Sequence, residues 1–279
     1  MLKLQDESRS LVLVSWDGLS RPLSSLLIDA RPNFDIVIFD YSGGNKNSQN
    51  FAVDGLSASL ISVKTECKGD IYQEFAKYIN SNKLLPYYVG LIDDDVVLSV
   101  SDLNRVLHLA VLKSLDVFSP TLTHDSNYSH SWMLQRPHRT VREVDWVEVM
   151  MPFYRREIFL AASGYFSGFS TSWGFDAYLF PMIQREVNMP RCGLVDAVAA
   201  LHFRPVSSHN KIYRSGMTAF EEAAAVKRKC IDHIAKNHPE WMSTEWYDRI
   251  YVRKRVYSAF QKFIYQLGRP IKQWLEKSG

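Results

Sequence analysis

Three consecutive aspartates mark the point where the sequence passes from an apolar run to a polar one. Residues 93–95 directly follow the apolar run 87–92, which is typical of a buried strand in a parallel sheet. Such sheets bind ligands at the carboxyl ends of their strands, and alternation would put Asp93 and Asp95 on one face and Asp94 on the other. Two carboxylates on one face suit Mg²⁺ or Mn²⁺ when phosphate oxygens and water complete the coordination.

The acidic run has a structural alternative. Acids after a strand often begin a solvated loop or cap the next helix, and Ser99, Ser101 and Asp102 lie where such a cap is expected. However, the chain has no Lys or Arg between Tyr87 and Arg105. Three crowded like charges are costly without a cation, so the pattern favours a metal site.

Two further polar residues stand where chemistry is expected. Asp176 ends a Trp-Gly-Phe-Asp block and precedes a predicted helix over 177–184. A carboxylate there, beside an aromatic ring, could take a proton from a bound sugar hydroxyl, although capping the helix would also explain it. His202 follows the buried run 195–201. It stands at another strand exit, where a structural role is the alternative to metal binding.

Composition limits the class of protein. The chain has 279 residues, of which 46% are apolar and 13% aromatic, enough for one large α/β domain or a domain with an appendage. No stretch approaches the ~20 apolar residues of a membrane span, and the acidic start is unlike a signal peptide, so we expect a cytoplasmic protein. Its three cysteines, Cys67, Cys192 and Cys230, are odd in number and far apart, which favours reduced thiols without a structural role.

Charge is concentrated in the tail. The net charge is +3, yet the chain from Arg249 onward carries eight basic residues against Glu276 alone. Aromatic residues alternate with these basic ones over 247–274, which is typical of a helix on an anionic membrane surface. We therefore expect possible peripheral contact with the inner face of the membrane; the alternative is a helix that packs on the domain. Nucleic acid is not expected, because the remainder of the chain is acidic and has no known binding module.

The first half alternates strands and helices. Strands are expected at 11–15, 34–39, 59–63, 87–92 and 117–118, the last closed by Pro120, and helices at 22–28, 71–79 and 103–111. This order predicts a βαβαβ half-sheet that binds a nucleotide.

The second half is less regular. A polar stretch at 121–139 precedes a predicted strand at 144–149, a helix at 155–162, a loop at 164–173 and a buried run at 193–203. A nucleotide-binding front half and an irregular back half fit a donor site and an acceptor site on one continuous sheet.

These blocks, in this order, resemble a GT-A-fold glycosyltransferase. More narrowly, segments 147–156, 172–176 and 193–202 are similar to a poorly characterised set of plant and bacterial proteins proposed to be sugar transferases. The resemblance covers about residues 10–210. It implies an α/β fold with a Rossmann-like, mostly parallel central sheet flanked by helices, divided into a donor half over about 1–120 and an acceptor half over about 121–210. Residues 211–279 would form a helical, basic C-terminal extension.

The resemblance also implies roles for matching residues. Asp93, Asp95 and His202 would bind the Mn²⁺ or Mg²⁺ that holds a nucleotide-sugar diphosphate, and the nitrogen ligand would favour Mn²⁺. The residues expected on the donor nucleotide are Asp40, Tyr41, Ser42, Gly43, Lys68 and Asp94.

For the acceptor, the resemblance implies that Asp176 is the base that activates a hydroxyl of a glycan or lipid-linked saccharide. Transfer would then proceed by in-line displacement with inversion. Glu148 is a second catalytic candidate, either in contact with the acceptor or in a polar network. One departure stands out, since the family often has Glu where this chain has Asp94.

Two other functions fit part of the pattern. Residues 93–97 also match the Asp-x-Asp-x-Val signature of haloacid-dehalogenase-type phosphatases, in which the first aspartate is a nucleophile. That family expects its motif on the first strand, whereas at least three predicted strands precede it here. A non-catalytic module that binds a sugar nucleotide or glycan is the second alternative.

Overall fold

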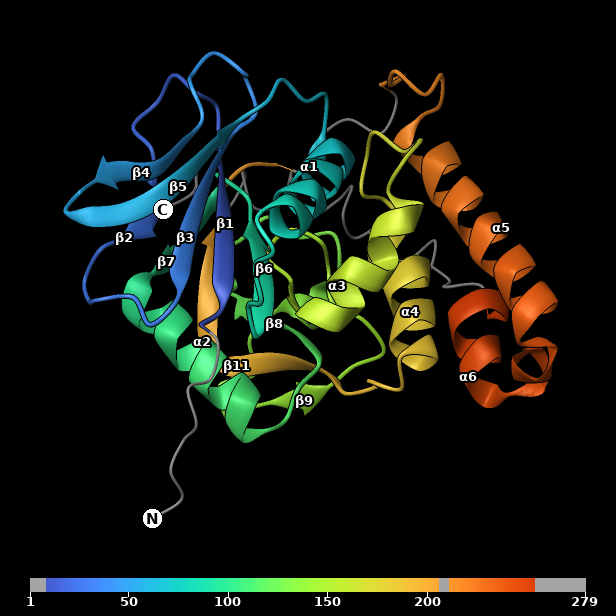
Figure 1. The fold of residues 1–279 in the computed structure, drawn as a ribbon. Helices are drawn as coiled ribbons and strands as arrows, with labels where there is room; N and C mark the ends of the chain where they lie inside the picture. Colours follow the sequence, from blue (N-terminus) through green and yellow to red (C-terminus); the bar gives the residue numbers. More distant parts are fainter. Residues whose placement is uncertain (1–8, 206–210, 254–279) are drawn as a thin grey trace, which may run out of the picture. The chain divides into compact units, whose positions relative to one another are not determined.

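A computed structural model describes residues 9–205 and 211–253 (Figure 1). The chain divides into two compact units, residues 1–233 and residues 234–279. The first unit contains the sheet and all the predicted site residues. The predicted boundary at residue 210 stays a prediction, although segment 211–222 makes its described contacts within the first unit.

The first unit is built on one mixed sheet of eleven strands. The strands are β1 (Leu11–Trp16), β2 (Leu26–Leu27), β3 (Asp35–Asp40), β4 (Ser48–Val53), β5 (Leu56–Ser62), β6 (Tyr88–Ile92), β7 (Val96–Ser99), β8 (Val117–Leu122), β9 (Arg142–Glu143), β10 (Phe153–Arg155) and β11 (Cys192–His202). Their order is β2-β7-β11-β8-β10-β6-β1-β3-β5-β4, and β9 pairs with β11. The predicted α/β class is confirmed.

Four neighbouring strands of the sheet, β6, β1, β3 and β5, run parallel to one another. β1 pairs in parallel with β3 and with β6, and β3 pairs in parallel with β5. β1 is buried along its whole length and β3 at every residue after Asp35, as expected for strands covered on both faces. The carboxyl ends of these strands therefore meet at one edge of the sheet.

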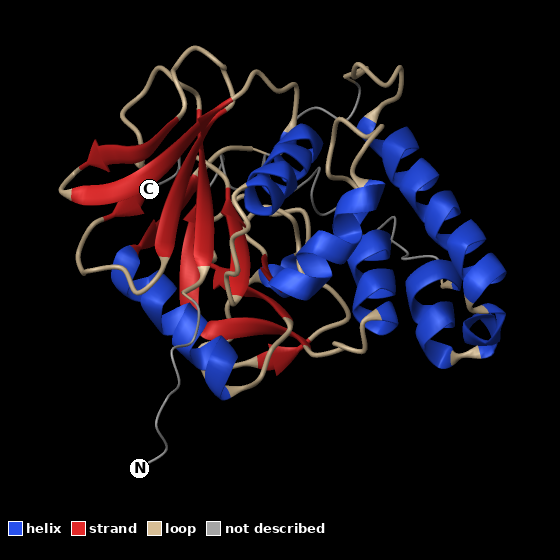
Figure 2. Ribbon diagram, viewed as in Figure 1, coloured by secondary structure: helices blue, strands red, loops and turns tan. Residues whose placement is uncertain are grey.

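Helices cover both faces of the sheet. The α-helices of the described residues are α1 (Lys68–Ser81), α2 (Val100–Leu112), α3 (Arg156–Ala162), α4 (Phe180–Glu186), α5 (Ala219–Asn237) and α6 (Glu245–Tyr247). In the first unit, α2 lies on one side of the strands, and α1, α3 and α4 lie on the other (Figures 1 and 2). α2 begins with a capping box between Ser99 and Asp102, which confirms the cap that the sequence indicated.

The helical face with α1 buries a cluster of aromatic rings. Tyr72 lies at its centre, and its ring contacts five others with centroid distances of 5.4 to 6.3 Å, those of Tyr154, Phe159, Phe166, Phe175 and Phe180. Interlocking aromatic rings fill large volumes and restrain one another's orientation. This packing fixes α1 and the start of α4 beneath the carboxyl edge of the sheet.

Three predicted elements were wrong. Segment 22–28 forms a turn and β2 instead of a helix, because Leu23 adopts φ 58, which a helix cannot accept. Segment 144–149 is irregular: the chain leaves the sheet after β9 to bury Trp146, Val147 and Glu148.

The third error concerned Pro120, which was expected to close a strand. Strand β8 continues through Pro120 to Leu122, and Pro120 takes a register position opposite Val195 of β11. The neighbouring Ser119 side chain donates to the Pro120 carbonyl, 2.8 Å away.

The second unit, within the described residues 234–253, is a short helical segment rich in aromatic residues. His238 stacks on Trp241 with a centroid distance of 3.9 Å, and Trp246 contacts Trp241 and Tyr251. Thr244 caps the turn of α6 through its side chain. The predicted membrane-binding helix over 247–274 falls mostly on residues outside the described ranges and stays a prediction.

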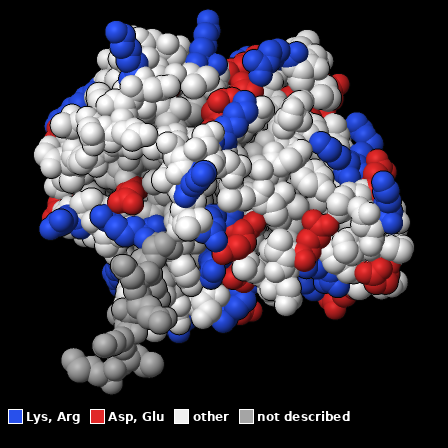
Figure 3. All heavy atoms as spheres, in the orientation of Figure 1, with Lys and Arg blue, Asp and Glu red and all other residues white. Residues whose placement is uncertain are grey.

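Charged side chains are spread over the surface. On the face drawn in Figure 3, basic and acidic groups of the described residues are interspersed, as on an ordinary solvated surface. Among the helices of the described ranges, none has the length and apolar character needed to cross a bilayer.

Candidate active site

The acidic triplet lies in the turn between β6 and β7. The Asp93 N–H donates to the Met150 carbonyl at 3.0 Å, and the Val96 N–H closes the turn on the Asp93 carbonyl at 3.2 Å. We predicted that strand alternation would separate Asp94 from Asp93 and Asp95. The three residues instead lie in a turn, and the turn separates them. Asp93 and Asp95 interact with each other, whereas Asp94 binds different partners.

Strand direction explains why His202 reaches this turn. β10 runs antiparallel to both β6 and β8, and β8 runs parallel to β11. β6 and β11 therefore end at the same edge of the sheet. In addition, β7 pairs antiparallel with the end of β11, which sets His202 opposite Val96, the residue after Asp95.

Asp93 is paired with a lysine from the start of α1. The Lys68 Nζ lies 2.6 Å from the Asp93 Oδ1. Burial raises the pKa of Asp93 to about 6, the charge of Lys68 opposes this, and the neighbouring Asp95 and Asp94 raise it further. Lys68 thus balances Asp93, and Asp94 is paired with Arg204 at 2.9 Å. Asp95 is therefore the acid whose charge a protonated His202 or a further cation would balance.

Asp95 and His202 form the other half of the cluster. The His202 Nε2 lies 3.4 Å from the Asp95 Oδ2. On the far side of the ring, the His202 Nδ1 lies 2.6 Å from the Asn127 carbonyl oxygen, which can only accept, so Nδ1 carries the hydrogen. Nε2 is then the nitrogen that faces Asp95. It is the atom that would bind a metal once its own proton is lost, the arrangement usual for histidine ligands of metals.

Asp95 and His202 each shift the pKa of the other towards its charged form. Burial alone would raise the pKa of Asp95, but the hydrogen bond from His202 and the charges of His202, Arg204 and Lys68 lower it overall. Burial alone would lower the pKa of His202, but Asp95 and the Asn127 carbonyl raise it overall. Asp95 is therefore held ionised.

The donor atoms fit a divalent cation. The Asp95 Oδ1 is buried and has no hydrogen-bond partner within the described part of the chain, which is unusual for a carboxylate oxygen. A cation would supply the missing partner. The Asp95 carboxylate and the His202 nitrogen are ligands of the kind that suits Mn²⁺. Asp93 is engaged by Lys68, and the three residues do not bring their ligand atoms within 4.8 Å of one another.

Asp94 connects the loop after β3 to the residues after β11. Its Oδ2 accepts from the Tyr41 hydroxyl at 3.0 Å and from the Arg204 guanidinium at 2.9 Å. Burial and the charge of Asp94 raise the pKa of Tyr41 to about 12, so the phenol remains a donor. Arg204, two residues after His202, is a site residue that the sequence analysis missed.

Asp40 organises its own loop. The buried carboxylate accepts five hydrogen bonds, from the Ser42 N–H and hydroxyl, the Asn45 N–H and side-chain amide, and the Ser62 hydroxyl. Burial would raise the pKa of Asp40, but these bonds hold it well below its ordinary value. Ser42 and Gly43 are exposed, as are residues 44–47, so this loop is open to a ligand.

Gly18 allows the loop after β1 to approach the loop after β3 closely. Gly18 has φ +76, and a Cβ there would lie 2.3 Å from the Ser42 Oγ and 2.5 Å from the Asp40 Oδ1. Only glycine accepts both the backbone conformation and the contact. The Asp17-Gly18 pair after a strand is a turn signal that the sequence analysis did not use.

The start of α1, which carries Lys68, is held by a neighbouring loop. The Gly69 N–H donates to the Ser170 carbonyl at 2.9 Å. The loop is fixed in turn by the buried Glu222 of α5, whose carboxylate accepts from the Ser170 and Thr171 amides, the Thr171 hydroxyl and the Ser215 hydroxyl. These contacts set the position from which Lys68 reaches Asp93.

Glu148 and Asp176 form a second pair of acids. Asp176 lies in a π-helical turn, Phe175–Leu179, that precedes α4, and its Oδ1 accepts from the Ala177 N–H at 2.6 Å. Glu148 is buried, and its Oε2 has no hydrogen-bond partner within the described part of the chain. Burial raises the pKa of Glu148 to about 7, and the charge of Asp176 raises it further. A carboxyl group with such a pKa can exchange a proton near neutral pH.

No protein-family profile and no curated protein match this chain, but solved structures do. S. aureus TarS 1–349 in complex with UDP-GlcNAc is similar with a TM-score of 0.54 and 14% identity, over 90% of this chain and 74% of that one. The longer S. aureus TarS gives 0.52 and 15%, over 89% and 44%. GalNAc-T7 with UDP, GalNAc and Mn²⁺ gives 0.53 and 13%, over 95% and 58%.

These similarities define the class of fold. The chain has the GT-A fold of glycosyltransferases, an α/β sheet flanked by helices, as the resemblance implied. The fold argues against the phosphatase alternative, which expects its motif on the first strand. Here the acids follow β6, after five other strands. The fold alone does not choose between a transferase and a binding module.

Proposed function

We propose that this protein is a metal-dependent glycosyltransferase that uses a nucleotide sugar as donor. The observation that carries the proposal is the contact of Asp95 with His202 at the carboxyl edge of the sheet, next to Asp93, with one buried Asp95 oxygen left unpaired within the described ranges. GT-A proteins of similar structure have been captured with UDP-GlcNAc and with UDP and Mn²⁺, which supports a nucleotide-sugar donor and the use of a metal.

In the donor half, Asp93, Asp95 and His202 would hold Mn²⁺ or Mg²⁺. When bound, such an ion neutralises the negative charge that develops on a departing diphosphate. Lys68, now paired with Asp93 at 2.6 Å, would supply a second positive charge to the phosphates. The exposed loop residues Ser42 and Gly43, on the frame that Asp40 maintains, would face the nucleoside.

In the acceptor half, Asp176 is the proposed base. An acceptor hydroxyl oxygen bonds to the anomeric carbon while the bond from that carbon to the diphosphate oxygen breaks, and the hydroxyl proton passes to Asp176. Attack opposite the leaving group inverts the anomeric configuration. Glu148, whose pKa is raised by the charge of Asp176, is protonated over part of the neutral pH range. It would hold the acceptor by hydrogen bonds. The acceptor class we propose is a glycan or a lipid-linked saccharide.

Nucleotide binding tests the proposal directly. Titration calorimetry with UDP, GDP, CDP and TDP, each with and without Mn²⁺, should give binding of one nucleotide that requires the metal and disappears with EDTA. Asp95→Asn, which keeps the size of the side chain but removes its charge, should weaken binding about 10-fold or more. Asp35→Asn is the matched control, because Asp35 begins β3 at the opposite edge of the sheet and is exposed.

The outcomes separate the alternatives. If no nucleotide binds in the presence of Mn²⁺, or if Asp95→Asn binds as well as Asp35→Asn, the proposed site is wrong. Metal-dependent binding without hydrolysis or transfer of any nucleotide sugar would favour the non-catalytic module instead.

A further inference from the structure

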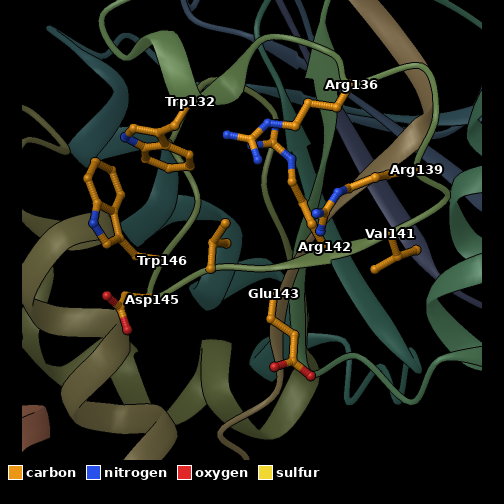
Figure 4. Close-up of a pocket in the computed structure, with 9 residues that line it drawn as sticks. Trp132, Arg136, Arg139, Val141, Arg142, Glu143, Asp145 and Trp146 are labelled. Carbon is orange, nitrogen blue, oxygen red and sulfur yellow. The ribbon is translucent and has the colours of Figure 1, made fainter.

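A pocket in the first unit, apart from the candidate active site, has one aromatic wall. Its volume is about 660 Å³, within the range of small-molecule sites. Trp132 and Trp146 stand edge to face with ring centroids 4.9 Å apart, and His130 stacks on Trp132. Figure 4 shows both indoles on the same side of the pocket. Flat aromatic faces of this kind can hold the apolar face of a sugar ring.

Guanidinium groups form the opposite wall. Arg136, Arg139 and Arg142 gather there, with their side chains directed towards one another (Figure 4). Arg142 is buried and ion-paired with Asp196 at 2.9 Å. Burial lowers the pKa of Arg142 and Asp196 opposes this, while the charges of Arg136 and Arg139 lower it further. Neither Arg136 nor Arg139 forms an ion pair with any acid of the described residues, so their charges are available to a ligand.

Two acids complete the lining. Glu143 and Asp145 are exposed, and Figure 4 shows the Glu143 carboxylate on the side away from the guanidinium groups. The pocket is therefore polarised, with positive charge at one end and carboxylate acceptors near the indoles and the rim. Such a division suits a ligand with a negative group at one end and hydroxyl donors at the other.

The basic wall is rigid. Asp196 of β11 accepts from the Arg142 Nε at 2.9 Å and from the Arg136 N–H at 2.8 Å, and its carbonyl accepts from the Gln135 side chain at 2.8 Å. The Arg142 guanidinium also donates to the Leu134 carbonyl at 2.9 Å. Segment 134–142 is thus tied to the sheet before any ligand binds, which reduces the entropic cost of binding.

The aromatic wall leads to the proposed acceptor carboxylates. Trp146 precedes Glu148 by two residues, a Cα separation of about 7 Å at most. Trp132 is connected to Glu148 through Ser129, which lies three residues before Trp132 and hydrogen-bonds to Glu148. Both indoles are therefore linked through short stretches of chain to Glu148, which interacts with Asp176.

We propose that this pocket binds an anionic saccharide as part of the acceptor. The sugar ring would lie on the half-buried Trp132, which the buried Trp146 supports, and a phosphate or carboxylate group would lie on Arg136 and Arg139. The inference rests on the proposed transferase function and adds the charge class of the acceptor. Arg142, already neutralised by Asp196, holds the wall in place. The guanidinium fork binds carboxylate and phosphate in two-point fashion, so the chemistry common to both is an oxyanion on a sugar.

The tryptophan indoles provide a direct readout. The chain has seven tryptophans, so ¹⁵N-correlated NMR of their indole N–H groups gives a small set of signals, and Trp132→Phe assigns that of Trp132. Titration of the full-length protein with glucose 6-phosphate, glucuronate and glucose compares phosphate, carboxylate and neutral sugars. We expect the Trp132 and Trp146 signals to shift with an anionic sugar at concentrations about 10-fold lower than with glucose.

Charge variants test the basic wall. The double variant Arg136→Gln/Arg139→Gln should remove the preference for anionic sugars, and added salt should weaken binding to the unaltered protein. Arg105→Gln, an exposed arginine of α2, is the matched control and should bind as the unaltered protein does. Both variants alter exposed side chains, and circular dichroism confirms their folding.

Several results would overturn the inference. Equal affinity for glucose and for both anionic sugars, an unchanged preference in the double variant, or anion-induced shifts confined to other tryptophans would each exclude an anionic saccharide from this pocket. The donor proposal is tested separately, by Mn²⁺-dependent nucleotide binding to the unaltered protein. A failure of nucleotide binding with intact sugar binding would refute the donor site alone, and the reverse would refute this pocket alone.

Discussion

Replacing Glu148 by Gln should change how the stability of the protein depends on pH. The side chain is 8% exposed, and its pKa is raised from 4.5 to about 7, first by burial and then by the charge of Asp176. The difference between these values corresponds to about 3 kcal/mol. Because the folded-state pKa is higher than the unfolded one, ionisation of Glu148 opposes folding.

The sign of the effect follows from this linkage. Below pH 4.5 Glu148 is protonated in both states, and it contributes no electrostatic penalty. As the pH rises through 4.5 to about 7, the unfolded chain ionises more readily than the folded one, so the free energy of unfolding falls by about 3 kcal/mol in total. The amide introduced by Glu148→Gln cannot ionise, so the variant does not lose this stability. Its free energy of unfolding should rise relative to that of the unaltered protein by the same amount as the pH increases from 4.5 to about 8.

Urea unfolding in EDTA across this pH range measures the difference between the two proteins. Taking the difference removes the contributions of other titrating groups, and a constant offset from the new amide does not affect its slope. Glu74→Gln on α1 is the control, since Glu74 forms a solvated pair with Lys77, and its difference curve should stay within about 0.5 kcal/mol. A flat curve for Glu148→Gln would refute the view that Glu148 is buried beside an ionised Asp176.

Two further substitutions probe the framework. Gly69→Ala would place a Cβ 2.3 Å from the Thr171 carbonyl oxygen and should lower the free energy of unfolding in urea by about 1–3 kcal/mol. Gly164→Ala, whose Cβ meets nothing within 4 Å, is the control and should change stability little. Equal effects of the two substitutions would contradict the contact at Gly69. Asp40→Asn turns an amide towards the donors of Ser42 or Ser62 and should lower the free energy of unfolding by about 3 kcal/mol, whereas an unchanged value would show that the loop does not depend on this carboxylate.

The buried strands were predictable because apolar runs dominate them. β1, β3 and β6 are covered on both faces, so their sequences show little alternation and stand out from their surroundings. β4 escaped notice because it lies at the end of the strand order, none of its residues is buried and its first three residues are polar. Its hairpin with β5 nevertheless carries a readable signal, Asp54-Gly55, where both residues adopt positive φ.

The site was predictable in outline for a topological reason. Residues that follow parallel strands share an edge of the sheet, and this rule alone brought Asp95 and His202 into one region. Their partners depend on long-range packing that no local pattern records. The Lys68–Asp93 pair spans 25 residues and the Arg204–Asp94 contact 110, and the burial of Glu148 arises only because its segment leaves the sheet.

The contacts of Glu222 show that the fold of the first unit requires residues beyond 210. An end at residue 210 would follow the sequence resemblance, but it would strip the Ser170 and Thr171 amides of their buried acceptor. Unsatisfied donors in a dry interior cost about 1–3 kcal/mol each, and the loop they belong to supports the helix that presents Lys68. Shortened forms for crystallisation or engineering should therefore retain α5, since it supports the loop on which α1 begins.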